Sequence, residues 1–139
     1  IMRVIREIYV HHSASSRDHT TRDMIRDWHV NGNHWSDIGY HYVIEGDGSI
    51  KEGRPVTRAG AHVKGNNKYT IGVCLTGNFE IDQPSRQQLD SLWSLIEGLL
   101  DNFGLTRRKV LAHHEDVNAE TKCCGENLYH YLVEWRKRG

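Results

Sequence analysis

The chain has 139 residues, of which 37% are apolar and 26% charged, with 18 basic and 18 acidic side chains. This length suits one domain spanning residues 1–139, and no apolar run approaches the roughly 18 residues of a membrane span. The even charge balance argues against electrostatic binding to nucleic acid or anionic lipid. We therefore expect a folded domain that has neither a nucleic acid nor a membrane as its partner.

A strand and a helix are predicted in the first part of the chain. The β-prone run over residues 5–11 predicts a strand that ends at a pair of histidines. Thr20 or Thr21 can cap a helix that ends at the Asn-Gly-Asn segment 31–33. The residues expected on the apolar face of this helix are Met24, Ile25 and Trp28.

A hairpin and a further strand are predicted in the middle of the chain. Residues 39–45 are typical of a strand, the Gly-Asp-Gly segment 46–48 indicates a tight turn, and residues 49–52 return as the hairpin partner. In residues 70–75, apolar side chains alternate with Gly72 and Cys74. This alternation predicts another strand.

The longest predicted helix begins after Ser85 and ends at Gly104. Its apolar positions are three and four residues apart, as on a helix packed against a core: Leu89, Leu92, Trp93, Ile96, Leu99, Leu100 and Phe103. A short strand over 110–113 follows, and Asn127 can cap a last helix. One side of that helix would carry Leu128, Tyr131, Leu132 and Trp135. Strands that alternate with helices indicate an α/β domain with a mixed sheet.

Histidines and cysteines gather where apolar strands end. Two pairs of histidines, 11–12 and 113–114, finish the first and last predicted strands, and two cysteines, 123–124, follow in the next loop. Because neighbours on a strand face opposite sides, one histidine of each pair can point into a common site. Two imidazoles and one thiolate can hold zinc and leave its fourth position open for water. Spacing alone leaves open whether these residues form a metal site or are unrelated.

The motifs of this chain, taken in order, resemble those of the zinc-dependent N-acetylmuramoyl-L-alanine amidases. This group includes the lysozyme of phage T7 and the peptidoglycan recognition proteins. The resemblance runs from about residue 5 to 135. Each motif alone is weak, but their combination and order are specific. The matching stretches are 8–14, 35–42, 46–54, 59–62, 70–79, 112–115 and 121–125.

The resemblance implies both a fold and a reaction. The fold is a central mixed sheet flanked by helices on both faces, with a zinc site at one end of a cleft. The reaction is hydrolysis of the amide between the lactyl group of N-acetylmuramic acid and the L-alanine of the peptidoglycan stem peptide. One Zn²⁺ per chain would be the cofactor, peptidoglycan the partner, and the protein a monomer.

A phage or prophage endolysin that lyses the bacterial cell wall fits this resemblance best. No signal peptide is recognised in the sequence. We therefore expect synthesis in the cytoplasm of the bacterial host and action on peptidoglycan in the periplasm or cell wall. A wall-binding protein that does not cut is the alternative, as recognition proteins without the ligand cysteine are of this kind.

The resemblance assigns the zinc ligands to His11, His113 and Cys123. The family has proline after the ligand cysteine, whereas this chain has Cys124. An alignment through Lys-x-Cys would make Cys124 the ligand instead. Glu115, which follows the second histidine pair, is a candidate for orienting a ligand imidazole from behind.

The resemblance also assigns catalytic and substrate-binding residues. Tyr40 matches the tyrosine that lies beside the zinc, where its hydroxyl can contact water, oxyanion or leaving amine. Thr121, two residues before the ligand cysteine, can donate to the oxyanion, and Lys122 is the alternative for this role. His62 and Trp35 are expected to contact the substrate.

Overall fold

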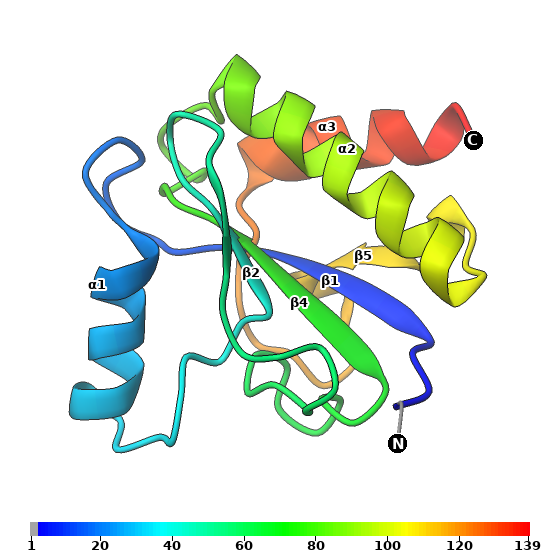
Figure 1. Ribbon diagram of the computed structural model, residues 1–139. Coiled ribbons are helices and arrows are strands. Elements are labelled where there is room, and N and C mark those ends of the chain that lie inside the picture. The colour runs from blue at the N-terminus through cyan, green and yellow to red at the C-terminus, as the bar shows by residue number, and fades with distance from the viewer. Residues whose placement is uncertain (1–2) are drawn as a thin grey trace.

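The computed structural model describes residues 3–139 and contains a five-stranded mixed sheet between helices (Figure 1). Within this range, no helix combines the length and the apolar character needed to cross a membrane. The main elements are β1 (Glu7–His12), α1 (Arg22–Asp27), β2 (Tyr42–Ile44), β3 (Ile50–Glu52), β4 (Thr70–Leu75), α2 (Arg86–Phe103), β5 (Val110–Ala112) and α3 (Glu126–Lys137).

The strands lie in the order β3-β2-β4-β1-β5. β1 is parallel to β4 and β5, and β2 is parallel to β4, while β3 alone is antiparallel to its neighbour. In this register His11 is opposite Cys74 and Val10 is opposite Ala112. The carboxyl-terminal ends of β1 and β5 therefore lie side by side at one end of the sheet. This brings the two histidine pairs together, as the sequence predicted.

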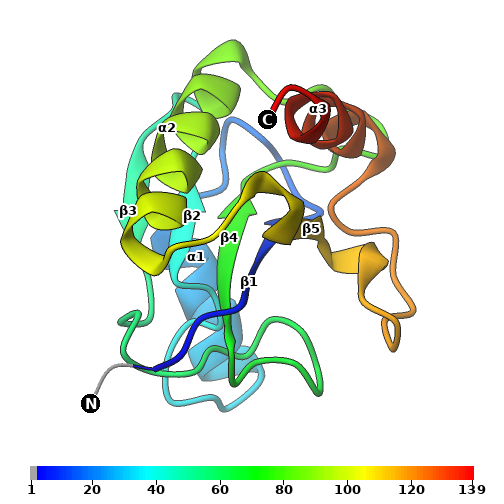
Figure 2. The same cartoon turned by 90° about the vertical axis from the view of Figure 1, so that its right-hand side faces the viewer.

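Helices cover both faces of the sheet, as expected (Figure 2). α2 and α3 lie on one face, over the side chains of alternate strand residues such as Ile8, Val10 and Val73. α1 lies on the other, where Ile25 packs with Val43 and Cys74. Strand alternation thus sends His12 to the α2/α3 face and His11 to the α1 face.

The predicted long helix is confirmed in its limits, and its predicted apolar positions all lie in the large core or pack against it. Ser85 is the N-cap of α2 and forms a capping box with Gln88, and Gly104 ends the helix with a positive φ of 65°. Leu92 and Ile96 are fully buried against the sheet. Trp93 of α2 stacks on Trp135 of α3, with ring centroids 4.9 Å apart, so the two helices are joined above the same face.

The strand predicted over 39–45 is shorter in the structure, where only Tyr42–Ile44 pairs with its neighbours as β2. The preceding residues bend, and a buried arginine holds the segment that leads into the bend. The Arg54 guanidinium donates to the carbonyl oxygens of Ile38, at 3.0 Å, and of Ala59, at 2.9 Å. The Tyr40 ring then lies on the α1 face of the sheet, close to the ring of His11.

The predictions for the two shorter helices are partly wrong. Met24 and Trp28 are 40% and 41% exposed, and Ile25 is the buried residue of α1. The helix ends at Asp27, and Trp28 opens a wider π-helical turn. In α3 the N-cap is Gly125 rather than Asn127, whose side-chain amide donates to the Asp82 carbonyl. Tyr131, expected on the apolar side of α3, is 38% exposed.

Candidate metal centre

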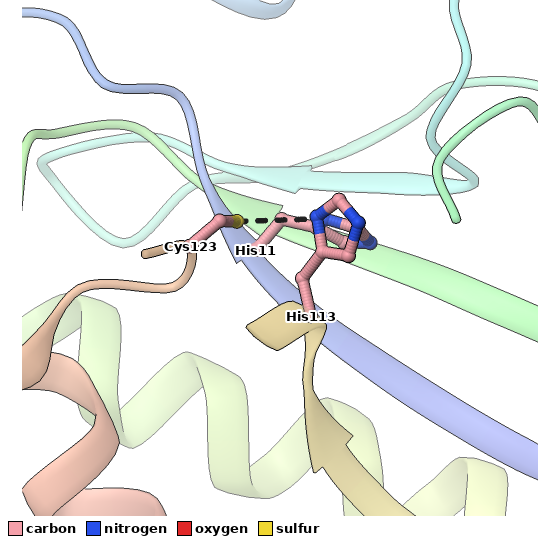
Figure 3. Close-up of side chains that lie close together, drawn as sticks. All are labelled: His11, His113 and Cys123. Carbon is pink, nitrogen blue, oxygen red and sulfur yellow. Dashed lines mark hydrogen bonds between the residues drawn. The ribbon is translucent and has the colours of Figure 1, made fainter. Parts of the chain in front are cut away.

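Three potential metal ligands from three separate segments meet at the edge of the sheet (Figure 3). His11 lies on β1, His113 opens the 3₁₀ turn that follows β5, and Cys123 lies in the loop before α3. The potential ligand atoms of these residues lie within 4.8 Å of one another. The structure therefore groups the same three residues that the family resemblance assigned.

The donor atoms fit zinc in type and in spacing. The His11 Nδ1 atom lies 3.6 Å from the Cys123 Sγ atom. Zn–N bonds of about 2.0–2.1 Å and a Zn–S bond of about 2.3 Å at a tetrahedral angle place nitrogen and sulfur about 3.6 Å apart. Two imidazoles and a thiolate also supply three protein ligands, the number with which catalytic zinc sites keep the fourth position open.

The neighbouring histidines and cysteine have other positions. The His12 ring faces the opposite side of the sheet, where its Nδ1 atom accepts from the Phe79 backbone at 3.0 Å. His114 donates its backbone N–H to the Cys123 carbonyl at 2.6 Å, and its Nδ1 atom lies 2.9 Å from the same oxygen. Cys124 is fully buried in the core beneath α2 and α3. These residues support the loop that carries Cys123.

Burial controls the charge of the candidate ligands. It lowers the pKa of His11 well below the usual value, and the neighbouring histidines lower it further, so the ring is neutral and can bind a metal. Burial also raises the pKa of the Cys123 thiol to about 12, although the His12 backbone N–H donates to the sulfur at 3.3 Å. A metal ion must therefore displace the thiol proton when it binds.

Tyr40 lies directly beside the candidate ligands. Its ring centroid is 5.0 Å from that of His11, and its ring also packs against the small cluster that contains Cys74. Burial raises the pKa of Tyr40 well above 10, and the nearby thiols of Cys74 and Cys123 raise it further. The hydroxyl is therefore a hydrogen-bond donor at neutral pH.

The expected oxyanion donor, Thr121, stands at the rim of the site. Its Oγ1 atom accepts from the Cys123 backbone at 3.2 Å, which leaves the hydroxyl proton free to donate. Thr121 lines a hollow of about 320 Å³ together with His113. Lys122 lines a second hollow, of about 340 Å³, beside His114. The hollow that contains a candidate ligand is thus shared with Thr121.

The two predicted substrate-binding residues differ in exposure. Trp35 is 37% exposed, and its ring lies 4.8 Å from that of His29, which in turn lies 5.6 Å from Tyr40. His62 is 8% exposed and lies behind His11, with its Nδ1 atom 2.8 Å from His11 Nε2. Substrate contact by Trp35 and His62 stays a prediction.

Sequence reasoning missed the polar residues that surround the ligands. His29 joins Trp35 to Tyr40, and Asn66 donates to the buried Asp116 carboxylate at 3.3 Å. The Asn66–Asp116 contact joins residues 50 apart in the chain, and the His29 contacts depend on the irregular segment between α1 and β2, so no periodic pattern indicated either. Glu115 was predicted to orient a ligand imidazole, and this is wrong. Its carboxylate instead pairs with Arg136 at 2.8 Å and accepts from the Ala112 backbone.

Comparison with known proteins identifies the family. A family model described as N-acetylmuramoyl-L-alanine amidase matches residues 2–126. The chain belongs to this amidase family. It is 39% identical over 119 residues to the endolysin of Enterobacteria phage T3, an alignment that covers 79% of this chain and 74% of the endolysin.

The chain is also similar to a peptidoglycan-recognition protein and to a bacterial amidase of known structure. Peptidoglycan-recognition protein SD of Drosophila melanogaster is 39% identical over 101 residues, which cover 73% of this chain but 54% of that protein. This chain thus aligns with about half the length of that relative. The N-acetylmuramoyl-L-alanine amidase LysC of Clostridium intestinale superposes with a TM-score of 0.85 at 29% identity, covering 97% of this chain and 87% of LysC.

Proposed function

We propose that this protein is a zinc-dependent amidase that cuts the bond between the lactyl group of N-acetylmuramic acid and L-alanine of the stem peptide. Membership of the amidase family supports a peptidoglycan amidase. The observation that carries the proposal is the 3.6 Å separation of His11 Nδ1 and Cys123 Sγ, with His113 in the same group. One Zn²⁺ per chain would be held by these three residues.

The ligand residues determine the charge of the site. His11 and His113 are neutral, since burial lowers the pKa of each. Two neutral imidazoles and the Cys123 thiolate around Zn²⁺ would give the site a single net positive charge. When bound, zinc supplies a Lewis acid that polarises the scissile carbonyl and acidifies water in the site.

Two hydroxyl groups are proposed to act on the reacting atoms. Tyr40 stays protonated because burial raises the pKa of its hydroxyl, so it can donate to the oxyanion that develops on the scissile carbonyl. Thr121 keeps a free hydroxyl proton beside the hollow that it shares with His113. We propose that the stem peptide enters this hollow and that Trp35 offers an exposed ring to the sugar or the peptide.

The biological setting that we propose is lysis of a bacterial cell wall by a phage or prophage endolysin. The similarity to the phage T3 endolysin supports this setting. The enzyme would be made in the host cytoplasm, act as a monomer, and reach peptidoglycan in the periplasm or cell wall. The recognition-protein relatives favour a second candidate function, binding of peptidoglycan without cleavage.

An end-group assay on purified peptidoglycan separates these functions. New L-alanine amino groups that disappear with a zinc chelator and return with added zinc are the expected result. New reducing sugar ends would contradict the proposal, because they indicate a glycosidase. Wall binding without either product would favour the second candidate function.

The Tyr40→Phe variant tests the proposed catalytic hydroxyl. We expect the zinc content and fold to be retained and kcat to fall by about 10²–10³-fold, as when one oxyanion donor is removed. Tyr42→Phe is a matched control, because Tyr42 packs against the opposite core and should keep normal activity. Turnover near the wild-type rate in Tyr40→Phe would remove this hydroxyl from the mechanism.

A further inference from the structure

We infer that His62 is a positioning residue, which holds the His11 ring so that its Nδ1 atom faces Cys123 and the metal. The inference rests on the zinc site proposed above. His62 Nδ1 lies 2.8 Å from His11 Nε2, while His11 Nδ1 lies 3.6 Å from Cys123 Sγ. One nitrogen of His11 thus faces the candidate ligand set, and the other is held from behind.

The hydrogen bonds beyond His62 determine which ring nitrogen carries the proton in His62 and in His11. A metal on His11 Nδ1 requires the proton on Nε2, which then donates to His62 Nδ1. The His62 proton must then be on Nε2, which lies 3.2 Å from Thr70 Oγ1. The Thr70 hydroxyl donates to the Asn66 carbonyl at 2.8 Å. A backbone carbonyl, which can only accept, therefore selects the tautomer of both rings.

The sheet leaves a slot for this imidazole. A Cβ atom on Gly72 of β4 would lie 2.6 Å from His62 Cγ, and one on Gly60 would lie 2.9 Å from His62 Cδ2. Real contacts of that length do not occur, so both positions must lack a side chain for the ring to lie where it does. A glycine inside a strand often marks such a close approach.

The backbone of His62 is held as firmly as its ring. The side-chain oxygen of Asn67 accepts from the N–H groups of His62 and Val63, at 2.9 Å each. The His62 side chain is buried, and both of its ring nitrogens have partners inside the protein. This arrangement suits a residue that orients the metal ligand His11. Residues that hydrogen-bond to a metal ligand typically raise metal affinity about 10- to 100-fold.

Two substitutions of equal size at His62 test the role of the acceptor. Leucine and asparagine have nearly the same shape, but only asparagine carries an oxygen near the position of Nδ1. We expect His62→Leu to weaken Zn²⁺ binding about 10- to 100-fold, and His62→Asn to recover most of the loss. The dissociation constant is measured by competition with a chromophoric chelator, without any peptidoglycan, and thermal unfolding of the zinc-free proteins checks the fold.

The outcomes separate this inference from the proposed function. A wild-type protein that binds no Zn²⁺ would overturn the zinc site itself. Tight binding by the wild type and by His62→Leu alike, or equal weakening by leucine and asparagine, would overturn only the positioning role. Should His62→Leu fail to fold, Thr70→Val removes the outer hydroxyl with little change of shape. Weakening of about fivefold is then expected, and unchanged affinity would contradict the inference.

Discussion

The two faces of the central sheet are built in different ways. Among residues 3–139, the face under α2 and α3 belongs to a cluster of 19 buried residues, nearly all apolar. The face under α1 has a cluster of only four, Ile25, Ile38, Val43 and Cys74. Beside that small cluster lie buried polar side chains, which include His11, His41, Arg54 and His62.

This difference shows how one sheet supplies both stability and chemistry. Apolar burial on the α2/α3 face provides the main driving force for folding. Polar groups can be buried on the α1 face only when each finds a hydrogen-bond partner. Within the described residues, every buried side-chain nitrogen and oxygen has such a partner. We therefore expect substitutions on one face to change stability and those on the other to change function.

The adjacent cysteines both belong to the large cluster, but Cys123 alone also faces His11, so the pair offers the sharpest test of this division. Cys123→Ala should weaken Zn²⁺ binding by more than about 100-fold, beyond the effect of an outer partner, and should abolish amidase activity. Cys124→Ala should keep the metal and cost about 1 kcal/mol of stability, since it removes one buried apolar group from the large core. Metal content and denaturant unfolding are measured for both. The reverse pattern would make Cys124 the ligand.

A substitution in the α2/α3 core should act on stability alone. Leu92 is fully buried, so Leu92→Ala is expected to lower the free energy of unfolding by about 2–5 kcal/mol. The folded fraction should keep the wild-type affinity for Zn²⁺. Urea unfolding and chelator competition on the same sample measure both quantities. A large loss of metal affinity in the folded variant would show that the faces are coupled.

The free energy of unfolding should depend on pH through His41, which is buried on the α1 face. Burial lowers the pKa of His41 from 6.5 to about 4, and its Nδ1 atom accepts from the Gly72 N–H. A lowered folded-state pKa stabilises the protein above about pH 6.5, and this contribution disappears as the pH falls to about 4. The wild type should lose up to about 3 kcal/mol relative to His41→Asn over this interval. Parallel unfolding curves for the two proteins at pH 7 and 4.5 would refute this expectation.

The same glycine-to-alanine change should have opposite signs at two positions. At Gly98, on the exposed side of α2, a Cβ atom meets nothing within 4 Å, and alanine should stabilise the helix by about 0.5–1 kcal/mol. At Gly72 a Cβ atom would press on His62, and overpacking should cost about 1–3 kcal/mol. Thermal unfolding of each variant measures the difference. Stabilisation by Gly72→Ala would mean that the His62 slot is looser than its distances indicate.

Local patterns predicted most of the elements because each depends on nearby residues. The period of apolar residues and the Ser85 and Gly104 caps defined α2. The period-two alternation in β4 identified the strand that lies beside β1. The strand predicted over 39–45 was too long because the carbonyl groups of its first residues accept from the backbone of Gly53, Arg54 and Ala61, outside the regular ladder, and no local pattern indicates these bonds.

The sequence by itself determined the fold class, the family and the set of residues that could hold a metal ion. Those properties follow from residue types and their order, because strand alternation and family motifs can be recognised in the sequence alone. Only the tertiary structure decided that Cys123 rather than Cys124 faces His11, and that His62 lies behind the same ring. The physical reason is that these contacts join segments about 50 to 110 residues apart, so they exist only after the sheet has brought its strands together.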